Sequence, residues 1–111
     1  DEDYGGLALE EEGTRCARLF QDPSVRTMIM GNHGVLFIGE TVAETFMRAY
    51  YFERAAETYI RALQTGRKLR VLSDEIAEKT AREIDGYPEQ ADRHLAELKA
   101  ILDEEGSTYA S

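Results

Sequence analysis

A lone histidine between two short apolar runs is the residue of this chain best placed to do chemistry. The tripeptide Asn32-His33-Gly34 follows the apolar run 28–30 and precedes the apolar run 35–38. A glycine-marked break between two strands would hold the ring rigidly and project it from a sheet, as a metal ligand is presented. A catalytic zinc site needs about three protein ligands. The alternative is a structural histidine at a turn, hydrogen-bonded and inert.

The second histidine and one glutamate are weaker candidates. His94 lies in the last predicted helix, so we expect it to flank a helix–helix contact; the alternative is a site residue lent to a neighbouring subunit. Glu53 lies on the aromatic side of a long predicted helix. There it would be a buried or half-buried acid paired with Arg48, Arg54 or a backbone group. Its alternative role is to orient the ring of His33.

Two further features of the first predicted helix have simple structural interpretations. Cys16 shares a helix face with Phe20, which is typical of a small core residue. A catalytic thiol would need a nearby base, and the sequence offers none. The run Glu10-Glu11-Glu12 is interpreted as a solvated helix start favoured by the helix dipole. Its remote alternative is an oxygen ligand for a hard metal.

Length and charge restrict the classes of partner. The 111 residues predict one domain, and an apolar fraction of 42% is enough for a packed core. The net charge of −9, from 22 acids and 13 bases, argues against nucleic acid and anionic membranes. One cysteine excludes an internal disulfide framework and favours a reducing, cytoplasmic compartment. No apolar run approaches the roughly 18 residues of a membrane span.

The elements that must position His33 are predicted from periodicity and from breakers. A helix is expected from about residue 8 to residue 20, ended by Pro23. The two apolar runs predict strands, and 31–34 joins them as a tight hairpin or as a bulged bend in one longer strand. Runs without alternation favour strands that are covered on both faces.

Three helices are expected after the strands. Thr41 and Glu44 form a capping box for a helix over 42–64 that stops at Gly66. Ser73 begins a second helix, and a third runs to about Glu104. The expected inward residues are Val42, Phe46, Ala49, Phe52 and Ala56 in the first, Ile76, Ala77, Thr80, Ala81 and Ile84 in the second, and Ala91, Leu95, Leu98, Ile101 and Leu102 in the third. Two strands make a poor sheet alone, so we expect them to be buried in a larger sheet or a subunit contact.

The stretch from Met30 to Phe46 resembles the class II aldolase/adducin family. The matching pattern is an apolar strand, Asn-His-Gly, a second apolar strand, a glycine and a Thr-capped helix. That helix continues with an aromatic-x-Glu-x-Ala-Ala run within 50–57. The segment Tyr4-Gly5-Gly6 and the helix after it also resemble the family. The likeness covers about residues 4 to 66, and the tail resembles the family only loosely.

The resemblance implies a fold and an assembly. The fold class is α/β: part of a three-layer α/β/α domain with a mostly antiparallel central sheet, here about two strands and four helices. This chain is similar to the C-terminal part of one such domain, with the sheet and long helix in 1–66 and the C-terminal helices in 67–111. The implied partner is a second copy, as in a homo-oligomer (a tetramer by resemblance), or the N-terminal half of the domain.

The resemblance also implies a metal site of which His33 is the one residue that carries over. Family enzymes hold a divalent metal, often zinc, by three histidines, and the other two come from a His-x-His pair in the earlier half. Metal chemistry of this kind stabilises an enediolate, so no Schiff-base lysine is needed. In some relatives a C-terminal tyrosine from an adjacent subunit serves as an acid or contacts substrate. Tyr87 and Tyr109 are the candidates here, with packing or surface exposure as the simpler interpretation.

Two functions therefore follow as expectations. The first is part of a metal-dependent aldolase-type lyase that acts on a small hydroxy-carbonyl or sugar-phosphate substrate. The second is a non-catalytic, adducin-like assembly module. A third interpretation, a free-standing small α-rich protein, needs no resemblance. Because the co-ligands of His33 are not in this chain, we expect the chain alone to bind metal poorly.

Overall fold

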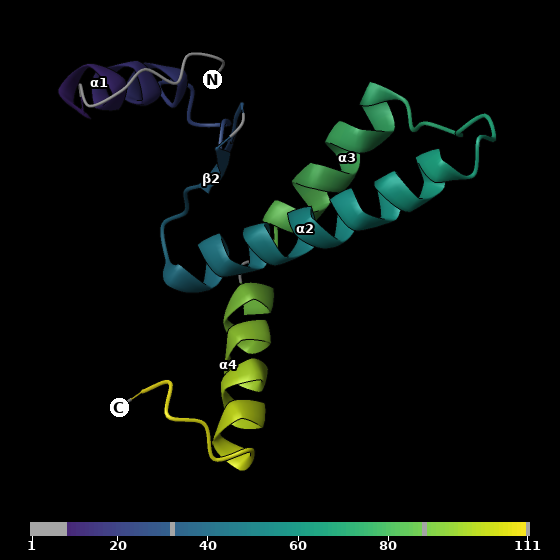
Figure 1. The fold of residues 1–111 in the computed structure, drawn as a ribbon. Helices are drawn as coiled ribbons and strands as arrows, with labels where there is room; N and C mark the ends of the chain where they lie inside the picture. The colour runs from purple at the N-terminus through teal and green to yellow at the C-terminus, as the bar shows by residue number, and fades with distance from the viewer. Residues whose placement is uncertain (1–8, 32, 88, 111) are drawn as a thin grey trace. The chain divides into compact units, whose positions relative to one another are not determined.

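The computed structural model describes residues 9–31, 33–87 and 89–110, whose elements are four helices and a two-stranded antiparallel sheet (Figure 1). This content agrees with the predicted α/β class. The chain divides into two compact units, Asp1–Glu40 and Thr41–Ser111. The first unit holds α1 and the sheet, and the second holds α2, α3 and α4.

In the first unit, α1 (Leu9–Leu19) ends at a turn built around Asp22. The Asp22 carboxylate accepts hydrogen bonds from the backbone N–H of Ser24 at 2.8 Å and from its hydroxyl at 2.7 Å. These bonds, from the side chain and then from the backbone, lower the pKa of Asp22 below its ordinary value. Pro23 lies within this turn, so the helix ends as the sequence predicted.

The sheet of the first unit is a hairpin of β1 (Thr27–Met30) and β2 (Gly34–Phe37). The two strands pair antiparallel along their whole length. A further backbone hydrogen bond, from the amide of Ile38 to the carbonyl of Arg26 at 2.9 Å, extends the ladder. Of the two predicted alternatives, the tight hairpin is therefore confirmed.

Each face of the hairpin has an exposed apolar side chain, because the paired residues Met28 and Leu36 share one face and Ile29 lies on the other. Met28 is 5% exposed, whereas its neighbour Ile29 is 63% exposed and Leu36 is 38% exposed. Within the described part of this chain the hairpin is therefore not covered on both faces, and its cover by a larger sheet or a subunit contact stays a prediction. A continuous apolar run marks two faces as apolar, but it does not require that one chain covers both.

In the second unit, α2 (Val42–Gln64) has the predicted bounds and caps. The Thr41 hydroxyl accepts a hydrogen bond from the backbone N–H of Glu44 at 3.1 Å, as in a capping box. At the other end, Gly66 has φ +66°, and its amide donates to the carbonyl of Leu63 at 3.1 Å. Glycine adopts this left-handed conformation at no steric cost, so the helix stops there.

The two following helices both carry acidic residues in their first turns. α3 (Asp74–Asp85) is capped by Ser73, whose hydroxyl accepts from the backbone N–H of Ile76 at 3.4 Å. Acids occupy its first turn and Arg82 its last, which suits the helix dipole. α4 (Glu89–Glu104) also carries acids in its first turn. The predicted helix bounds are thus confirmed to within a residue or two.

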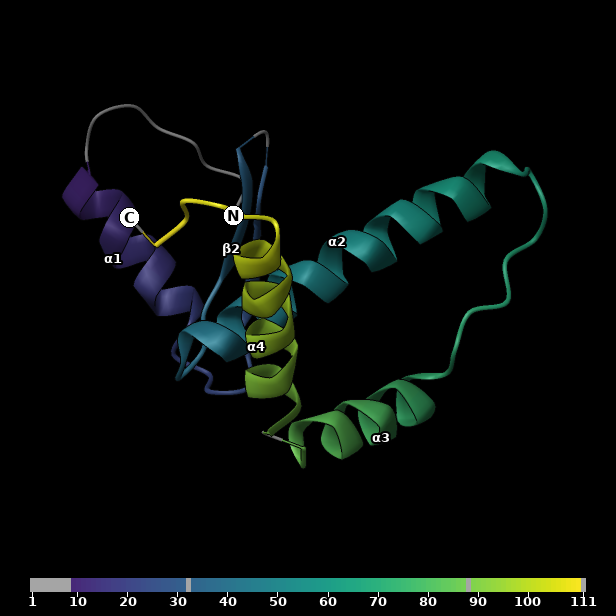
Figure 2. The same cartoon turned by 90° about the horizontal axis from the view of Figure 1, so that it is seen from below.

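α4 packs against the N-terminal half of α2, and this contact is the main core of the second unit (Figure 2). Ala91 of α4 is 1% exposed and Ala43 of α2 is 5% exposed. Small residues allow two helix backbones to approach closely, so larger side chains can pack around them.

α3 has no comparable partner among the described residues. It buries none of its side chains, and it shares no extended contact with another described element. Ile76 is 51% exposed and Ile84 is 50% exposed. The expectation that its apolar stripe faces inward is therefore wrong for this chain. Periodicity identifies which face of a helix is apolar, but it does not say what covers that face.

Candidate functional site

His33 lies at the tip of the β1–β2 hairpin. A three-residue connection joins Met30 to Gly34, which are paired at the end of the ladder. The backbone N–H of His33 donates to the carbonyl of Met30 at 3.1 Å, which closes the turn. The histidine side chain is exposed. Asn32, which the sequence motif includes, lies outside the described residues.

The backbone conformation at Gly34, directly after the histidine, favours glycine. Gly34 has φ +152°, a conformation that L-residues with side chains rarely adopt. No heavy atom lies within 4 Å of the place where a Cβ would stand, so the constraint comes from the backbone and not from crowding. The hairpin therefore fixes the backbone on both sides of His33 and leaves its side chain at the surface.

The described residues do not form a metal site by themselves. They contain no group of three or more His, Cys, Asp or Glu side chains arranged to hold a metal ion. His33 can supply one ligand, whereas a zinc site takes three or four. A metal at this position would need ligands from outside the described residues.

His94 packs into a group of aromatic rings on α2. Its ring centroid lies 4.7 Å from that of Tyr50, 5.8 Å from that of Tyr51 and 5.9 Å from that of Phe46. The contact with Tyr50 is edge to face, a favourable geometry for two rings. The prediction that His94 flanks a helix–helix contact is thus confirmed, and the contact is that of α4 with α2.

Two buried nitrogens of the second unit lack hydrogen-bond partners among the described residues. They are Nδ1 of His94 and Nε of Arg48. Sequence reasoning singled out His94 but considered Arg48 only as a partner for Glu53. The guanidinium of the neighbouring Arg54 lies 5.5 Å from the Tyr50 ring centroid, in a cation–π contact. The aromatic run 50–52 was the available signal for this cluster.

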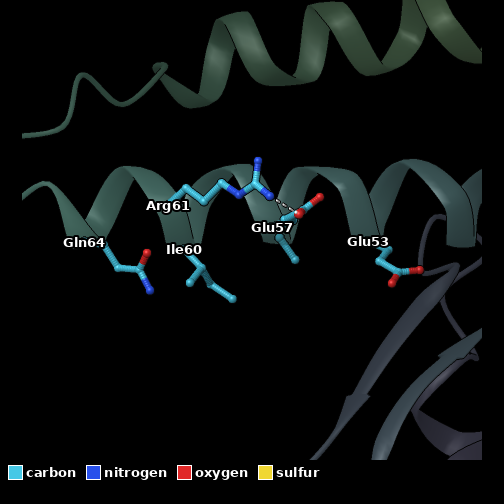
Figure 3. A pocket seen from close by; sticks show the side chains of 6 residues that line it. Glu53, Glu57, Ile60, Arg61 and Gln64 are labelled. Atoms are coloured by element: carbon cyan, nitrogen blue, oxygen red, sulfur yellow. Dashed lines mark hydrogen bonds and ion pairs between the residues drawn. The ribbon is translucent and has the colours of Figure 1, made fainter.

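Glu53 is exposed on α2, so the prediction of a buried or half-buried acid is wrong. Figure 3 shows Glu53, Ile60 and Gln64 projecting from the same side of the helix. A shallow depression there is lined by residues of α2 alone. On its border Arg61 pairs with Glu57 at 2.6 Å. α4 covers a different stretch of α2, which leaves this face in solvent.

The two tyrosine candidates are at the surface. Tyr87 is 70% exposed and Tyr109 is 45% exposed. Partial desolvation and a hydrogen bond with Asp103, together with its charge, raise the pKa of Tyr109 above its ordinary value. A tyrosine with a raised pKa is a poorer proton donor, so this contact gives no support to an acid role.

The candidates on α1 behave as surface and packing residues. Cys16 and Glu12 are half-buried, and Glu11 is exposed. The side chain of Glu10 lies outside what the structure describes.

No helix of the described chain is both long enough and apolar enough to cross a bilayer.

Comparison with known proteins gives a family match over the first half of the chain. The family model described as Class II Aldolase and Adducin N-terminal domain matches residues 2–60. That range includes α1, the hairpin with His33, and most of α2. No solved structure matched the chain.

Individual relatives extend the likeness. The protein hu-li tai shao of Drosophila melanogaster is 34% identical over 101 residues, which is 90% of this chain and 9% of that protein. A putative aldolase class 2 protein of Caulobacter vibrioides is 35% identical over 81 residues, 72% of this chain and 31% of that protein. Human gamma-adducin is 33% identical over 61 residues, 55% of this chain and 9% of that protein. The chain therefore spans less than a third of each of these relatives.

Proposed function

Because the chain belongs to the class II aldolase and adducin family, we propose that it is the C-terminal part of such a domain and that His33 is one of its metal ligands. Residues 1–66 would supply sheet and long helix, and residues 67–111 the C-terminal helices. The remaining ligands, the rest of the sheet and the acid or base would come from outside this chain. The activity proposed for the complete protein is that of a metal-dependent lyase on a small hydroxy-carbonyl or sugar-phosphate substrate.

The observation that carries this proposal is the position of His33. It stands at a hairpin tip whose backbone is fixed by the His33–Met30 hydrogen bond and by Gly34. Its side chain is exposed and can meet ligands from another part of the protein. A divalent metal, zinc by family resemblance, is the proposed ion. The proposed setting is the cytoplasm, as part of a homo-oligomer.

A second candidate function is an adducin-like assembly module without catalysis. The observation in its favour is the extent of the likeness to hu-li tai shao, which covers 101 residues, against 81 for the putative aldolase class 2 protein. That likeness takes in at least part of the C-terminal helices, which carry none of the family's metal ligands. These helices would then serve contacts between proteins and not chemistry.

Elemental analysis of the complete protein tests the metal proposal and separates the two functions. We expect His33→Ala to lower the bound metal by about tenfold or more, because a three-ligand site loses one of its ligands. The matched control is His94→Ala, which removes the chain's other histidine and should leave the metal content unchanged. Normal metal stoichiometry in His33→Ala would remove this residue from the site. A wild-type complete protein that binds no metal would favour the assembly module.

A further inference from the structure

The connection between α2 and α3, residues 66–73, is a segment that a protease can reach. It contains no helix or strand, and all of its residues are exposed except Leu69, which is half-buried. Val71 is 80% exposed and Leu72 is 64% exposed. Exposed segments without regular structure are the preferred sites of proteolytic cleavage in folded proteins.

The backbone of this connection is held only at its ends. At the start, the amide of Gly66 donates to the carbonyl of Leu63 at 3.1 Å. At the end, the carbonyl of Ser73 accepts from the amide of Ala77 at 3.0 Å. Between these points, residues 68–72 make no backbone hydrogen bond to another described residue. Their amide and carbonyl groups are therefore available to pair, as an extended strand, with the binding cleft of another protein.

Three cationic side chains lie in this connection. Arg67, Lys68 and Arg70 are exposed, and none of them forms an ion pair with another described residue. The chain has 13 basic residues, and nine of the other ten lie in helices, where the backbone must open before it can be cut. The tenth, Arg26, is half-buried, and its carbonyl accepts from the amide of Ile38 at 2.9 Å.

From these observations we propose that the Arg70–Val71 peptide bond is a proteolytic modification site for a trypsin-like serine protease. Such proteases select a basic side chain with an acid in their specificity pocket. The stretch 67–73 places four residues before the bond and three after it, all outside the helices. It can therefore enter a protease as one strand while α2 and α3 stay folded.

The two other basic residues of the connection are less well placed. The bond after Arg67 lies one residue beyond Gly66, whose left-handed conformation, φ +66°, belongs to the end of α2. The bond after Lys68 leads into Leu69, the half-buried residue of the connection. Cleavage at either bond would disturb neighbouring structure, whereas cleavage after Arg70 would not.

The modification is a hydrolysis that adds one water molecule across the bond. The hydroxyl of that water goes to the carbonyl carbon of Arg70, which becomes a new terminal carboxylate after it loses its proton. The nitrogen of Val71 takes a proton and becomes a new amino terminus. The protease is regenerated unchanged.

The cut chain should stay in one piece, because α4 holds the second fragment on α2. Cleavage separates residues 1–70, which carry α2, from residues 71–111, which carry α3 and α4. Ala91 of α4 is 1% exposed, and the ring of His94 packs among three rings of α2. His33 lies in the first fragment, away from the cut, so the inference does not depend on the proposed metal site.

Limited digestion of the full chain with trypsin tests the site, with intact-mass spectrometry to identify the products over time. We expect fragments 1–70 and 71–111 to appear first. Arg70→Gln should slow the first cut about tenfold or more, because glutamine carries no charge for the specificity pocket. The matched control is Arg26→Gln, which should leave the time course unchanged. A first cut at any other bond, or an unchanged rate in Arg70→Gln, would overturn the site.

Gel filtration of the cut chain tests whether α4 retains the second fragment. Fragments 1–70 and 71–111 should elute together at the position of the intact chain, and they should separate in urea. Separate elution in native buffer would overturn this part of the inference. The complete protein should show the same first cut, and protection of the stretch 67–73 there would overturn the site itself.

Discussion

α3 and α4 are consecutive amphipathic helices of the same unit, and they differ in whether their apolar faces are buried. Both carry acids in the first turn and an apolar stripe at helical spacing. α4 packs on α2, where Ala91 is 1% exposed and His94 meets three aromatic rings. α3 buries none of its residues. The pattern that makes a helix amphipathic therefore does not decide whether the rest of the chain covers it.

The difference lies in what each stripe offers to α2. α4 presents a small, almost fully buried residue, Ala91, and a flat ring, His94, that packs among Tyr50, Tyr51 and Phe46. Flat rings and small residues on one helix match the aromatic face of the other. The ends of the α3 stripe are two isoleucines.

Enlarging the most buried residue of α4 should have the largest effect. We expect Ala91→Leu to lower the free energy of unfolding by about 1 to 3 kcal/mol, because Ala91 is 1% exposed and the added carbons would have to displace packed neighbours. The measurement is urea unfolding followed by circular dichroism at low protein concentration.

Ala77→Leu in α3 is the matched control for that substitution. Ala77 is exposed, and leucine is nearly as good a helix former as alanine, so the change should stay within about 0.5 kcal/mol. Equal losses in the two variants would show that Ala91 is no more constrained than Ala77, and the contrast between the helices would fail.

Removing the His94 ring should have the next largest effect. We expect His94→Ala to cost about 1 to 2 kcal/mol in urea unfolding, because three ring contacts are lost. His94→Phe should cost less than about 0.5 kcal/mol, since it keeps the ring and removes the unpartnered Nδ1. Thr80→Ala, at the middle of the α3 stripe, is the control and should be nearly neutral. A phenylalanine variant as unstable as the alanine variant would mean that the imidazole makes a specific polar contact.

The sequence carries most of the local structure of this chain and little of its burial. The bounds of α2 follow from Thr41, Glu44 and Gly66, because capping and left-handed glycine depend on neighbouring residues only. The hairpin follows from the apolar runs for the same reason. Exposure of Glu53 was not predictable, because it depends on where α4 meets α2, and that is a tertiary property.

The candidate site shows the same limit. The motif around His33 predicts a histidine at a break between two strands, and the structure has it at a hairpin tip. The role of that histidine depends on ligands from outside the described residues, so it stays a prediction. His94 was predictable as a contact residue from its helical position, but the aromatic rings around it were not, since they come from a helix more than 40 residues earlier.

The C-terminal ends of α3 and α4 also differ, in the backbone conformation of the glycine that follows each helix. α4 ends in a Schellman motif: Gly106 has φ +69°, its amide donates to the carbonyl of Asp103 at 3.1 Å, and the amide of Ser107 donates to that of Leu102 at 2.9 Å. α3 ends at Gly86 with φ −73°, an ordinary conformation for any residue. The backbone therefore favours glycine at position 106, whereas position 86 can accept other residues.

Gly106→Ala should cost about 1 kcal/mol, because a Cβ is disfavoured in the left-handed region. Gly86→Ala should be neutral or stabilise by up to about 0.5 kcal/mol, because its added Cβ would lie 3.5 Å from the Arg82 and Glu83 carbonyl oxygens, an ordinary contact, and the unfolded chain would lose freedom. Urea unfolding of the two variants measures both. Equal effects would indicate that the end of α4 frays before the chain unfolds, so that its Schellman motif contributes no more to stability than the simpler end of α3.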